Sequence, residues 1–433
     1  MRVVILSSTL GYGHIRAAEA VEEALREQGP GIEIETIDFW SLMNDTVAGA
    51  IKAGYLSLVT HEPELYDHLH RLDRAAWRAF LRRPEMPRPM SQICSDIIRE
   101  WFPGRNGFPA RGESLDQVLL LNLLGSFASD APVSSNVVRR GLVLWMHRML
   151  VKRLKRRLQR RMPDAIVATQ MMPASLLPAL DLDDLPTIAV LTDYGVHPFW
   201  RDSSMSHYCI ATDSMAAGLL APNAKRTVSV TGIPLMKGFR RPHDQAVART
   251  RLGIDADRRV VLVTGGGYGI GALETLKLIS KAELDCEILV AASGLRHDSR
   301  ELSVLTGHHS ERIHVFCDNA NMPTLVSAAD VVVGKPGGLS VSEALACGRP
   351  FFAVSCLGGQ ERFNVDYLKH HRVGDRFDAD TLIEPLKNWL EDPLKLAQVK
   401  SRAWNLGKRN GAEQIASVLC NELIERAPRK SLS

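Results

Sequence analysis

The 433-residue sequence lacks any apolar run approaching the ~18 to 20 residues that a membrane-spanning helix needs. Its first residues, Met1 to Leu6, are a brief apolar stretch that leads directly into a glycine-rich turn, so we expect no cleaved signal peptide. The seven cysteines are scattered and form no C-x-x-C pair. This spacing argues against a disulfide framework or a zinc site and predicts reduced thiols in a cytoplasmic protein.

Acidic residues are absent from one segment of a chain whose net charge is only +4. Between Arg139 and Arg161 there are ten Lys or Arg and no Asp or Glu, so the rest of the chain is net acidic. A mildly acidic body with one basic segment is not the charge pattern of a nucleic-acid-binding protein. It indicates one surface that meets an anionic partner.

Two segments of the chain share a strand, turn and helix pattern. Arg2 to Ser8 is a predicted strand, Thr9 to His14 a turn and Ile15 to Gln28 a helix. The pattern restarts with a strand at 259–264 and the glycine-rich turn Gly265 to Gly271. Further short apolar strands are predicted at 32–39, 165–169, 187–192, 208–211, 227–231, 287–292, 313–316, 331–333 and 351–354. This alternation predicts an α/β protein with two doubly wound parallel sheets.

The predicted domains are 1–238 and 239–433, with an irregular, proline-rich insertion at about 80–138. A basic helix is predicted over 139–161, and a last helix over 412–426. Ligands of doubly wound sheets bind at the carboxyl ends of the strands, so the cleft shared by the two domains is the expected site.

The most specific stretch of the sequence is a strand that ends at Gly334 and continues through a loop into a helix. The free N–H groups at the start of such a helix bind anions, and adjacent glycines let a diphosphate approach the backbone. Glu343, one turn inside, is a candidate acceptor for ribose hydroxyls. The candidate donor-binding residues of this loop and of the earlier glycine-rich turn are Gly266, Gly267, Lys335, Gly337, Gly338, Leu339, Ser340 and Glu343.

Together with this block, the G-Q-E-x-x-N stretch from Gly359 to Asn364 resembles the nucleotide-sugar domain of family 28 glycosyltransferases. It is similar to the branch of monogalactosyldiacylglycerol synthases and processive diacylglycerol glucosyltransferases. The loop Gly11 to His14, the block Thr192 to His197 and the block Val230 to Pro234 resemble the first half of that branch. The resemblance implies a GT-B fold, with two facing Rossmann-like domains, the donor in the cleft and the last helix returning to the first domain.

The resemblance also implies an inverting transfer of hexose from a UDP-sugar to diacylglycerol or a related lipid. Inversion needs a base for the acceptor and stabilisation of the departing UDP. His14 is the first candidate for the base, with Gly13 beside it on the acceptor side; a loop-fixing hydrogen bond is its structural alternative. Asp193 and His197 are the next candidates, as a base or a base-orienting pair, against a capped turn with a surface His.

Four further residues, Gly359 among them, extend the predicted donor site. By resemblance Gln360 and Glu361 hold sugar hydroxyls and Asn364 supports that pocket, while a plain helix start is the alternative. Lys335 is either a partner for the diphosphate or a solvated loop lysine. No D-x-D sequence lies beside the donor block, so we expect no metal and no cofactor besides the UDP-sugar co-substrate.

The basic helix predicts peripheral attachment to the inner face of the cell membrane. Arg153, Arg156 and Arg157 represent its charged side, and each Lys or Arg near an anionic bilayer contributes about 1 kcal/mol. In the structural alternative, the helix packs by its apolar side and its charges are merely solvated. Apolar residues of the insertion, Trp101, Phe102, Phe108 and 119–124, are expected to dip into the interface.

Other enzyme classes share parts of this pattern. A GT-B-shaped UDP-sugar epimerase has no use for a basic helix, and a transferase for polyprenyl-diphosphate-linked sugars fits the G-Q-E-x-x-N ending less well. A catalytically silent binding module is disfavoured by the intact candidate residues. The sequence leaves open glucose against galactose, processivity and the oligomeric state.

Overall fold

The computed structural model describes residues 1–29, 31–80, 87–102, 117, 120, 122–124, 127, 134–180, 182, 185–203, 205–219, 226–282, 284–292, 302, 304, 307, 311–318, 321–354 and 358–426. Most of the predicted insertion at 80–138, including Phe108, 119 and 121, lies outside these residues. Within it, the structure forms the helix α5 (Arg88–Trp101) and buries Phe102, Leu120 and Leu124 in the core of the first domain, so the expectation that these three enter a membrane interface is wrong.

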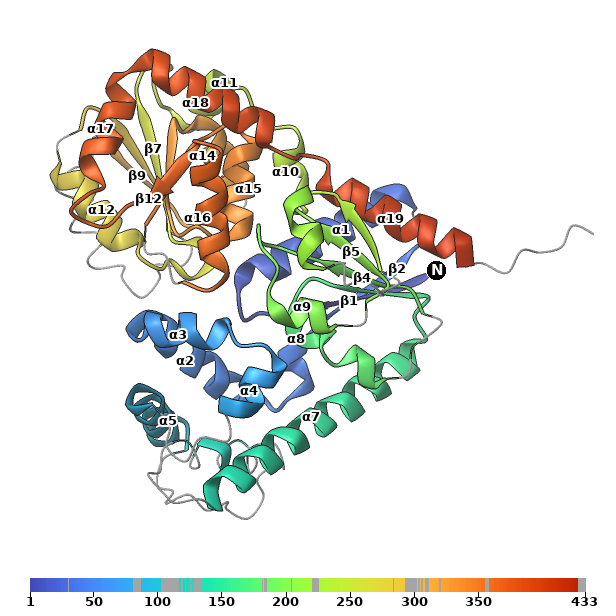
Figure 1. Cartoon of the computed structure of the whole chain (residues 1–433). Coiled ribbons are helices and arrows are strands. Elements are labelled where there is room, and N and C mark those ends of the chain that lie inside the picture. The colour runs from blue at the N-terminus through green and yellow to red at the C-terminus, as the bar shows by residue number, and fades with distance from the viewer. Residues whose placement is uncertain are drawn as a thin grey trace, which may run out of the picture.

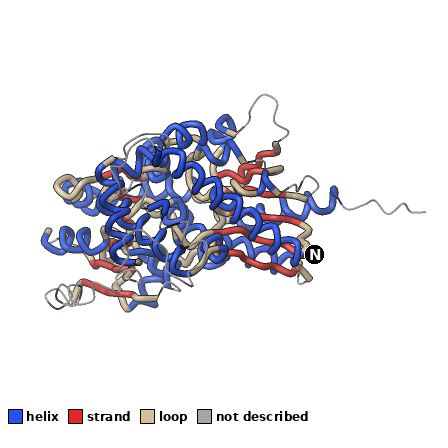
Figure 2. Tube along the Cα trace, turned by 90° about the horizontal axis from the view of Figure 1, so that it is seen from below, coloured by secondary structure: helices blue, strands red, loops and turns tan. Residues whose placement is uncertain are grey.

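Two six-stranded sheets, each parallel throughout, form the centres of the molecule (Figures 1 and 2). The first has the order β2-β1-β3-β4-β5-β6, and the second the order β12-β11-β10-β7-β8-β9. The strands of the first sheet are β1 (Arg2–Ser7), β2 (Glu33–Asp38), β3 (Ala165–Ala168), β4 (Thr187–Val190), β5 (His207–Ile210) and β6 (Thr227–Val230). The strands of the second are β7 (Val260–Thr264), β8 (Glu287–Ala291), β9 (Ile313–Phe316), β10 (Val331–Gly334), β11 (Phe351–Ala353) and β12 (Gly374–Arg376).

The strand sequences explain this arrangement. β7 reads VVLVT and every one of its residues is buried, as in a central parallel strand that is covered on both faces. The predicted strands agree with the observed ones to within one or two residues; β12 was not predicted because its three residues, GDR, carry no apolar pattern. The predicted class, two doubly wound domains, is confirmed.

Helices cover both faces of each sheet (Figure 1). Those up to the end of the first sheet are α1 (Tyr12–Gln28), α2 (Asp45–His61), α3 (Pro63–His70), α4 (Arg74–Phe80), α5, α7 (Ser134–Arg161), α8 (Met171–Ala174) and α9 (Pro198–Asp202). Those that follow are α10 (Lys237–Arg240), α11 (Gln245–Leu252), α12 (Ala272–Lys281), α14 (Met322–Ala328), α15 (Gly338–Ala346), α16 (Gln360–His370), α17 (Ile383–Glu391), α18 (Pro393–Leu406) and α19 (Gly411–Arg426).

The last helix, α19, leaves the second sheet and packs against the first domain (Figure 1). Its buried residues Ala412, Ile415 and Leu419 share an apolar cluster with β1 and α1. The Gln28 side chain donates to the Glu413 carbonyl over 3.1 Å. The chain therefore crosses between the domains twice, which limits how far they can separate.

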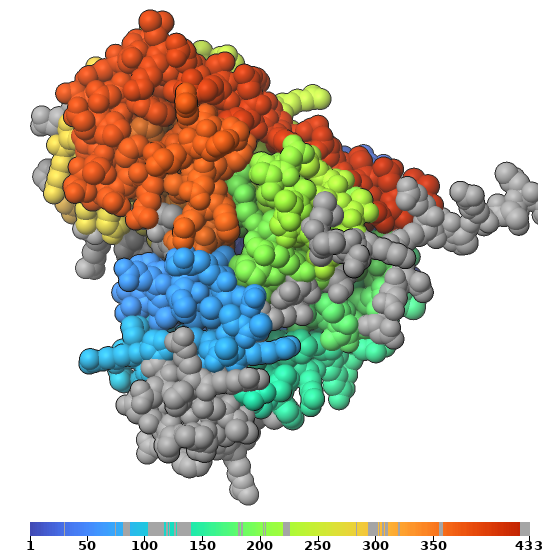
Figure 3. Space-filling view, in the orientation of Figure 1, coloured from blue at the N-terminus to red at the C-terminus, as the bar shows by residue number. Residues whose placement is uncertain are grey.

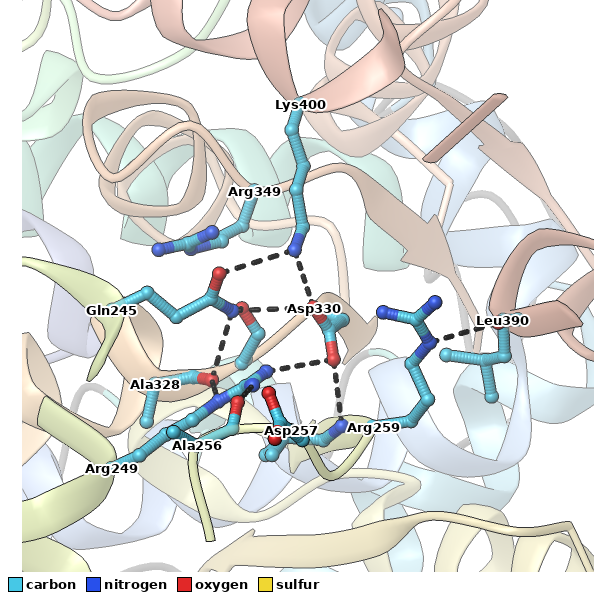
Figure 4. A network of polar contacts seen from close by, with 12 residues as sticks. Gln245, Arg249, Ala256, Asp257, Arg259, Ala328, Asp330, Arg349, Leu390 and Lys400 are labelled. Carbon is cyan, nitrogen blue, oxygen red and sulfur yellow. Dashed lines mark hydrogen bonds and ion pairs between the residues drawn. The ribbon is translucent and has the colours of Figure 1, made fainter. Parts of the chain in front are cut away.

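A buried polar network closes the amino end of the second sheet (Figure 4). Asp330, immediately before β10, accepts hydrogen bonds over 2.8 Å from the Arg249 guanidinium and from the Val260 backbone N–H. Lys400 forms an ion pair with the other carboxylate oxygen, and Gln245 donates to it over 3.2 Å. The network therefore ties α11, α18 and the first residues of β7 and β10 together.

Candidate active site

A cleft lies between the two sheets, and both domains form its walls. Two loops of the second domain follow β7 and β10, the neighbouring strands between which the strand order reverses. Open α/β sheets bind their ligands at such a switch point. The predicted residues that line the cleft are Gly13, His14, Asp193, Gly266, Gly267, Lys335, Gly337, Gly338, Leu339, Ser340, Glu343, Gln360 and Glu361.

His14 lies in the first turn of α1, which begins three residues earlier than predicted, at the carboxyl end of β1. Its Nδ1 is 3.0 Å from the Thr169 carbonyl oxygen and 3.0 Å from Thr192 Oγ1. A carbonyl only accepts, so Nδ1 carries the proton and Nε2 keeps its lone pair. Burial lowers the pKa of His14 to about 4, a shift that the Thr169 bond opposes and the Lys335 charge increases. The imidazole is therefore neutral, as a general base must be.

Asp193 lies on the same wall of the cleft, and Asn364 reaches it from the second domain. The Asn364 amide nitrogen donates to Asp193 Oδ1 and to the Pro336 carbonyl, both over 2.9 Å. The amide oxygen accepts the Tyr194 N–H over 2.9 Å. Burial raises the pKa of Asp193, and the Asn364 bond partly offsets that rise. Asn364 thus supports the pocket from behind, by holding the loop that carries Asp193, and does not line the cleft.

His197 lies outside the cleft wall, with both of its ring nitrogens engaged. Nε2 donates to the His70 carbonyl over 2.7 Å, and Nδ1 accepts the Phe199 N–H over 3.1 Å. Burial, with the His70 charge second, lowers the pKa of His197 to about 3. The structure therefore places His197 as a support for α3, and not as the base or base-orienting partner that the sequence suggested.

The start of α15 meets the first domain at a point where only glycine fits. A β-carbon on Gly338 would lie 1.9 Å from the Thr192 carbonyl oxygen. Gly266, in the neighbouring loop, has a φ of +63°, which residues with a β-carbon rarely adopt. The first N–H groups of α15 lack partners within the helix, so this end favours an anion. Leu339 and Ser340 occupy its first turn.

Lys335 follows β10 and is half-buried beside Glu361 in the first turn of α16, with which it forms an ion pair. Burial by itself lowers the pKa of Lys335. The charge and hydrogen bond of Glu361 raise the pKa by more than burial lowers it, so the net shift is upward. The ammonium is therefore a fixed cation at the cleft, unlike the solvated loop lysine of the alternative interpretation.

Glu343 lines the cleft one turn inside α15, with Arg16 of the first domain on the opposite wall. Burial raises the pKa of Glu343 to about 7, and the Arg16 charge only partly opposes this shift. The carboxyl is thus poised between its neutral and charged forms near neutral pH, where a charged partner or a hydrogen-bonding ligand selects one of them.

Three tyrosines in the cleft wall were not singled out from the sequence. The rings of Tyr55 and Tyr66 meet edge to face with centroids 5.9 Å apart, and the Tyr268 hydroxyl donates to the Thr9 carbonyl over 2.6 Å. An aromatic residue inside the glycine-rich turn was the available signal for Tyr268.

The basic helix α7 packs by one side and exposes another. Leu154 and Leu158 are buried, and Arg153 donates to the Leu42 carbonyl over 2.7 Å. Arg157 and Arg161 form ion pairs with Glu35 at 3.2 and 2.6 Å. The exposed residues of this helix include Leu144, Trp145, Arg148, Lys152, Lys155, Arg156 and Arg160, and Arg157 and Arg161 also remain exposed although they pair with Glu35. Of the predicted membrane-facing arginines, Arg156 is therefore on the exposed side, whereas Arg153 and Arg157 contact the fold.

The described part of the chain contains no helix with both the length and the apolar character to cross a membrane. It also contains no group of three or more His, Cys, Asp or Glu side chains arranged to hold a metal ion.

Solved structures identify the fold class. The MurG of Acinetobacter baumannii matches with a TM-score of 0.55 over 97% of this chain and 99% of its own, at 13% identity. The glycosyltransferase SnogD from Streptomyces nogalater matches with a TM-score of 0.54 over 98% of this chain and 99% of its own, at 17% identity. The two facing domains thus form the GT-B fold of glycosyltransferases.

Sequence comparison indicates which branch of glycosyltransferases this chain resembles. The family model described as monogalactosyldiacylglycerol (MGDG) synthase matches residues 132–235. A processive diacylglycerol beta-glucosyltransferase of Bacillus cytotoxicus is 28% identical over 429 residues, covering 97% of this chain and 94% of that protein. One of Bacillus mycoides is 26% identical over the same shares. The resemblance to this branch of family 28 glycosyltransferases is therefore confirmed over nearly the whole chain.

Proposed function

We propose that this protein is an inverting glycosyltransferase that moves a hexose from a UDP-sugar to a hydroxyl of diacylglycerol or a related membrane lipid. The observation that carries the proposal is the position of His14, which faces the anion-binding loops across one cleft with its Nε2 lone pair available. The names of the relatives support the lipid acceptor.

On the acceptor side, His14 Nε2 takes the proton of the lipid hydroxyl as its oxygen attacks C1 of the hexose. The bond between C1 and the diphosphate oxygen breaks, and the electron pair leaves with UDP. Because the pKa of His14 is about 4, the imidazole is already neutral at pH 7 and needs no prior deprotonation. Asp193, on the same wall, is the alternative base.

On the donor side, the charge that develops on UDP is stabilised by the Lys335 ammonium and by N–H groups in the first turn of α15, of which that of Gly338 also hydrogen-bonds Asp193. Preorganised donors of this kind lower the barrier because they need no reorientation as the charge forms. Glu343 accepts hydrogen bonds from the ribose, and Gln360 and Glu361 bind hydroxyls of the hexose.

UDP release by the purified protein tests the proposal. UDP-glucose and UDP-galactose are supplied in turn, with and without diacylglycerol in anionic mixed micelles. We expect release with one of the two donors that depends on the lipid. Measurable UDP binding without lipid-dependent release from either donor would overturn the acceptor assignment.

Replacement of the base tests the mechanism. His14→Ala should retain UDP affinity and lose turnover by about 10²- to 10⁴-fold, because only the proton transfer is removed. His61→Ala, which changes an exposed histidine of α2, is the matched control. Turnover of His14→Ala near that of His61→Ala would transfer the role to Asp193.

The exposed side of α7 supports attachment to the inner face of the cell membrane. It carries basic residues beside Trp145, a residue type that settles at the bilayer interface, and Leu144. These side chains suit a surface of anionic lipids, whose glycerol hydroxyls then lie close to the enzyme.

Charge reversal tests this attachment. Changing the exposed Lys152, Lys155, Arg156 and Arg160 to Glu should release the protein from vesicles of anionic lipid while UDP affinity is retained. The matched control reverses four exposed lysines of the second domain: Lys281, Lys369, Lys387 and Lys395. Equal vesicle binding by the two variants would refute the assignment to α7.

A further inference from the structure

Helix α3 of the first domain touches the start of α16 in the second domain. The backbone N–H of Gly359, the residue just before α16, donates to Asp67 Oδ1 over 2.8 Å. No side-chain hydrogen bond from Gly359 itself caps the helix, since glycine has none to offer. A carboxylate at the positive end of a helix is the stabilising arrangement, and here the carboxylate comes from the other domain.

The two domains fit closely at this contact. Gly358 and Gly359 have φ values of +76° and +57°. A β-carbon on Gly358 would lie 2.8 Å from Asp67 Cβ, and one on Gly359 would lie 2.9 Å from Cγ of the His70 ring. In Figure 3 the blue surface that includes α3 lies directly against the orange surface of the second domain. Both glycines are therefore required by backbone conformation and by the neighbouring helix.

Helix α3 is itself held in place by further contacts. The His197 ring donates to the His70 carbonyl and lies edge-on to the His70 ring, with centroids 4.3 Å apart. Asp67 also pairs with Arg71 of its own segment and lies 3.7 Å from the Arg362 guanidinium of α16. Asp67 is thus presented on a supported helix, and its position does not depend on a mobile side chain alone.

We infer that Asp67 is a positioning residue for the donor sugar, acting by capping α16 across the domain boundary. Gln360 and Glu361 directly follow the capped glycine and line the cleft, and Glu361 also binds Lys335. The contact with Asp67 fixes the first turn of α16, and with it these two side chains. The inference rests on the proposed function, because it assigns the hexose to Gln360 and Glu361.

As a consequence, the two parts of the donor, UDP and the hexose, depend on Asp67 to different degrees. The uridine diphosphate binds to the loops after β7 and β10, which Asp67 does not contact. The hexose binds to the first turn of α16. Loss of Asp67 should therefore weaken the binding of a UDP-hexose and spare the binding of UDP. A purely structural role for Asp67 would change both affinities together or neither.

Calorimetric titration of the full chain with UDP and with UDP-glucose and UDP-galactose tests this division. For the donor that the enzyme uses, Asp67→Ala should weaken binding by about ten- to a hundredfold, the effect of losing a hydrogen bond to a charged group. Its UDP affinity should stay at the wild-type value. Asp67→Asn keeps an oxygen that accepts the Gly359 N–H and should recover most of the loss. Glu64→Ala, an exposed acidic residue on the same helix, is the matched control.

A second variant approaches the same contact from the other domain. Gly359→Ala should weaken UDP-hexose binding in the same way, because its β-carbon displaces the His70 ring. The double variant with Asp67→Ala should be little worse than either single one, since both disturb the same packing of α3 against the start of α16. Independent, multiplicative losses would overturn the inference.

The outcomes separate this inference from the proposed function. Wild-type binding of UDP-hexose with an unchanged Asp67→Ala variant, or equal weakening of UDP and UDP-hexose, overturns the role of Asp67 alone. Binding of UDP but of neither UDP-hexose by the wild-type protein overturns both. The titrations contain no lipid, so failure of the acceptor assignment leaves this test intact.

Discussion

The two ends of strand β10 carry the same kind of ion pair for opposite purposes. Asp330 precedes the strand and binds Lys400, and Lys335 follows the strand and binds Glu361. The pair at the amino end is enclosed by Arg249, Gln245 and backbone groups, so its hydrogen-bonding capacity is used within the protein (Figure 4). The pair at the carboxyl end lines the cleft.

The pKa shifts express the same contrast. Burial lowers the pKa of Lys400 more than Asp330 can restore it, whereas Glu361 more than restores that of Lys335. At the amino end several cations share one carboxylate, so the carboxylate is the group that cannot be lost. At the carboxyl end one lysine faces the cleft, where the proposed donor would place its diphosphate. Burial of an ion pair therefore does not by itself indicate a function. A function is indicated where one of the paired groups can still contact a ligand.

The largest effect should come from removing the carboxylate at the amino end. Asp330→Ala leaves Arg249 and Lys400 buried without their partner, which should lower the free energy of unfolding by about 3 to 5 kcal/mol. Urea unfolding measures the change. Asp380→Ala, at an exposed aspartate of the same domain, should stay within about 0.5 kcal/mol of the wild type. Equal urea midpoints for the two variants would contradict a stabilising role for Asp330.

The same substitution at each end gives the next largest effect. Lys335→Met should weaken UDP binding by about 10- to 100-fold, which corresponds to about 1.4 to 2.8 kcal/mol, because a charged partner of the diphosphate is lost. Lys400→Met should leave UDP affinity unchanged and lower stability instead. Titration with UDP and urea unfolding of both variants measure the two quantities. A loss of UDP affinity in Lys400→Met as large as in Lys335→Met would contradict the division of roles.

The smallest expected effect is the pH dependence of stability. It has opposite signs for Glu343, beyond the carboxyl end of β10, and for Asp330, at the amino end. The pKa of Glu343 rises from its ordinary value of 4.5 to about 7 in the folded protein. The folded state therefore binds more protons than the unfolded state between these values, and its stability falls as the pH rises through them. Glu343→Gln should gain stability relative to the wild type across this range, with a constant gain above pH 7.

Asp330 changes stability with pH in the opposite direction to Glu343. Burial by itself raises the pKa of Asp330, but Lys400 and Arg249 lower it below its ordinary value. Its contribution is therefore present above pH 3.8 and is lost as the pH falls through the lowered value. Thermal unfolding from pH 2 to pH 9 measures both; a Glu343→Gln gain that grows toward acid pH would contradict the assignment.

The sequence predicted most of the fold and the location of the site. Buried parallel strands are short apolar runs, and phosphate loops are glycines at strand ends, so both are local features. It did not predict which cations of α7 face outward. Arg153 and Arg157 differ from Arg156 only in their direction from the helix axis, and Leu42 and Glu35, their partners, come from distant segments.

By itself, the sequence determined the two doubly wound domains, the glycine-rich donor loops and the candidate base, since each depends on neighbours along the chain. Only the tertiary structure decided how the side chains are used. Thr169, 155 residues from His14, sets the tautomer of the candidate base. The carbonyl of His70, 127 residues from His197, accepts a hydrogen bond from that ring, and Asp67 accepts one from the backbone of Gly359, 292 residues away. The reason is physical: a hydrogen bond acts over about 3 Å, and only the closed fold brings such distant residues that close.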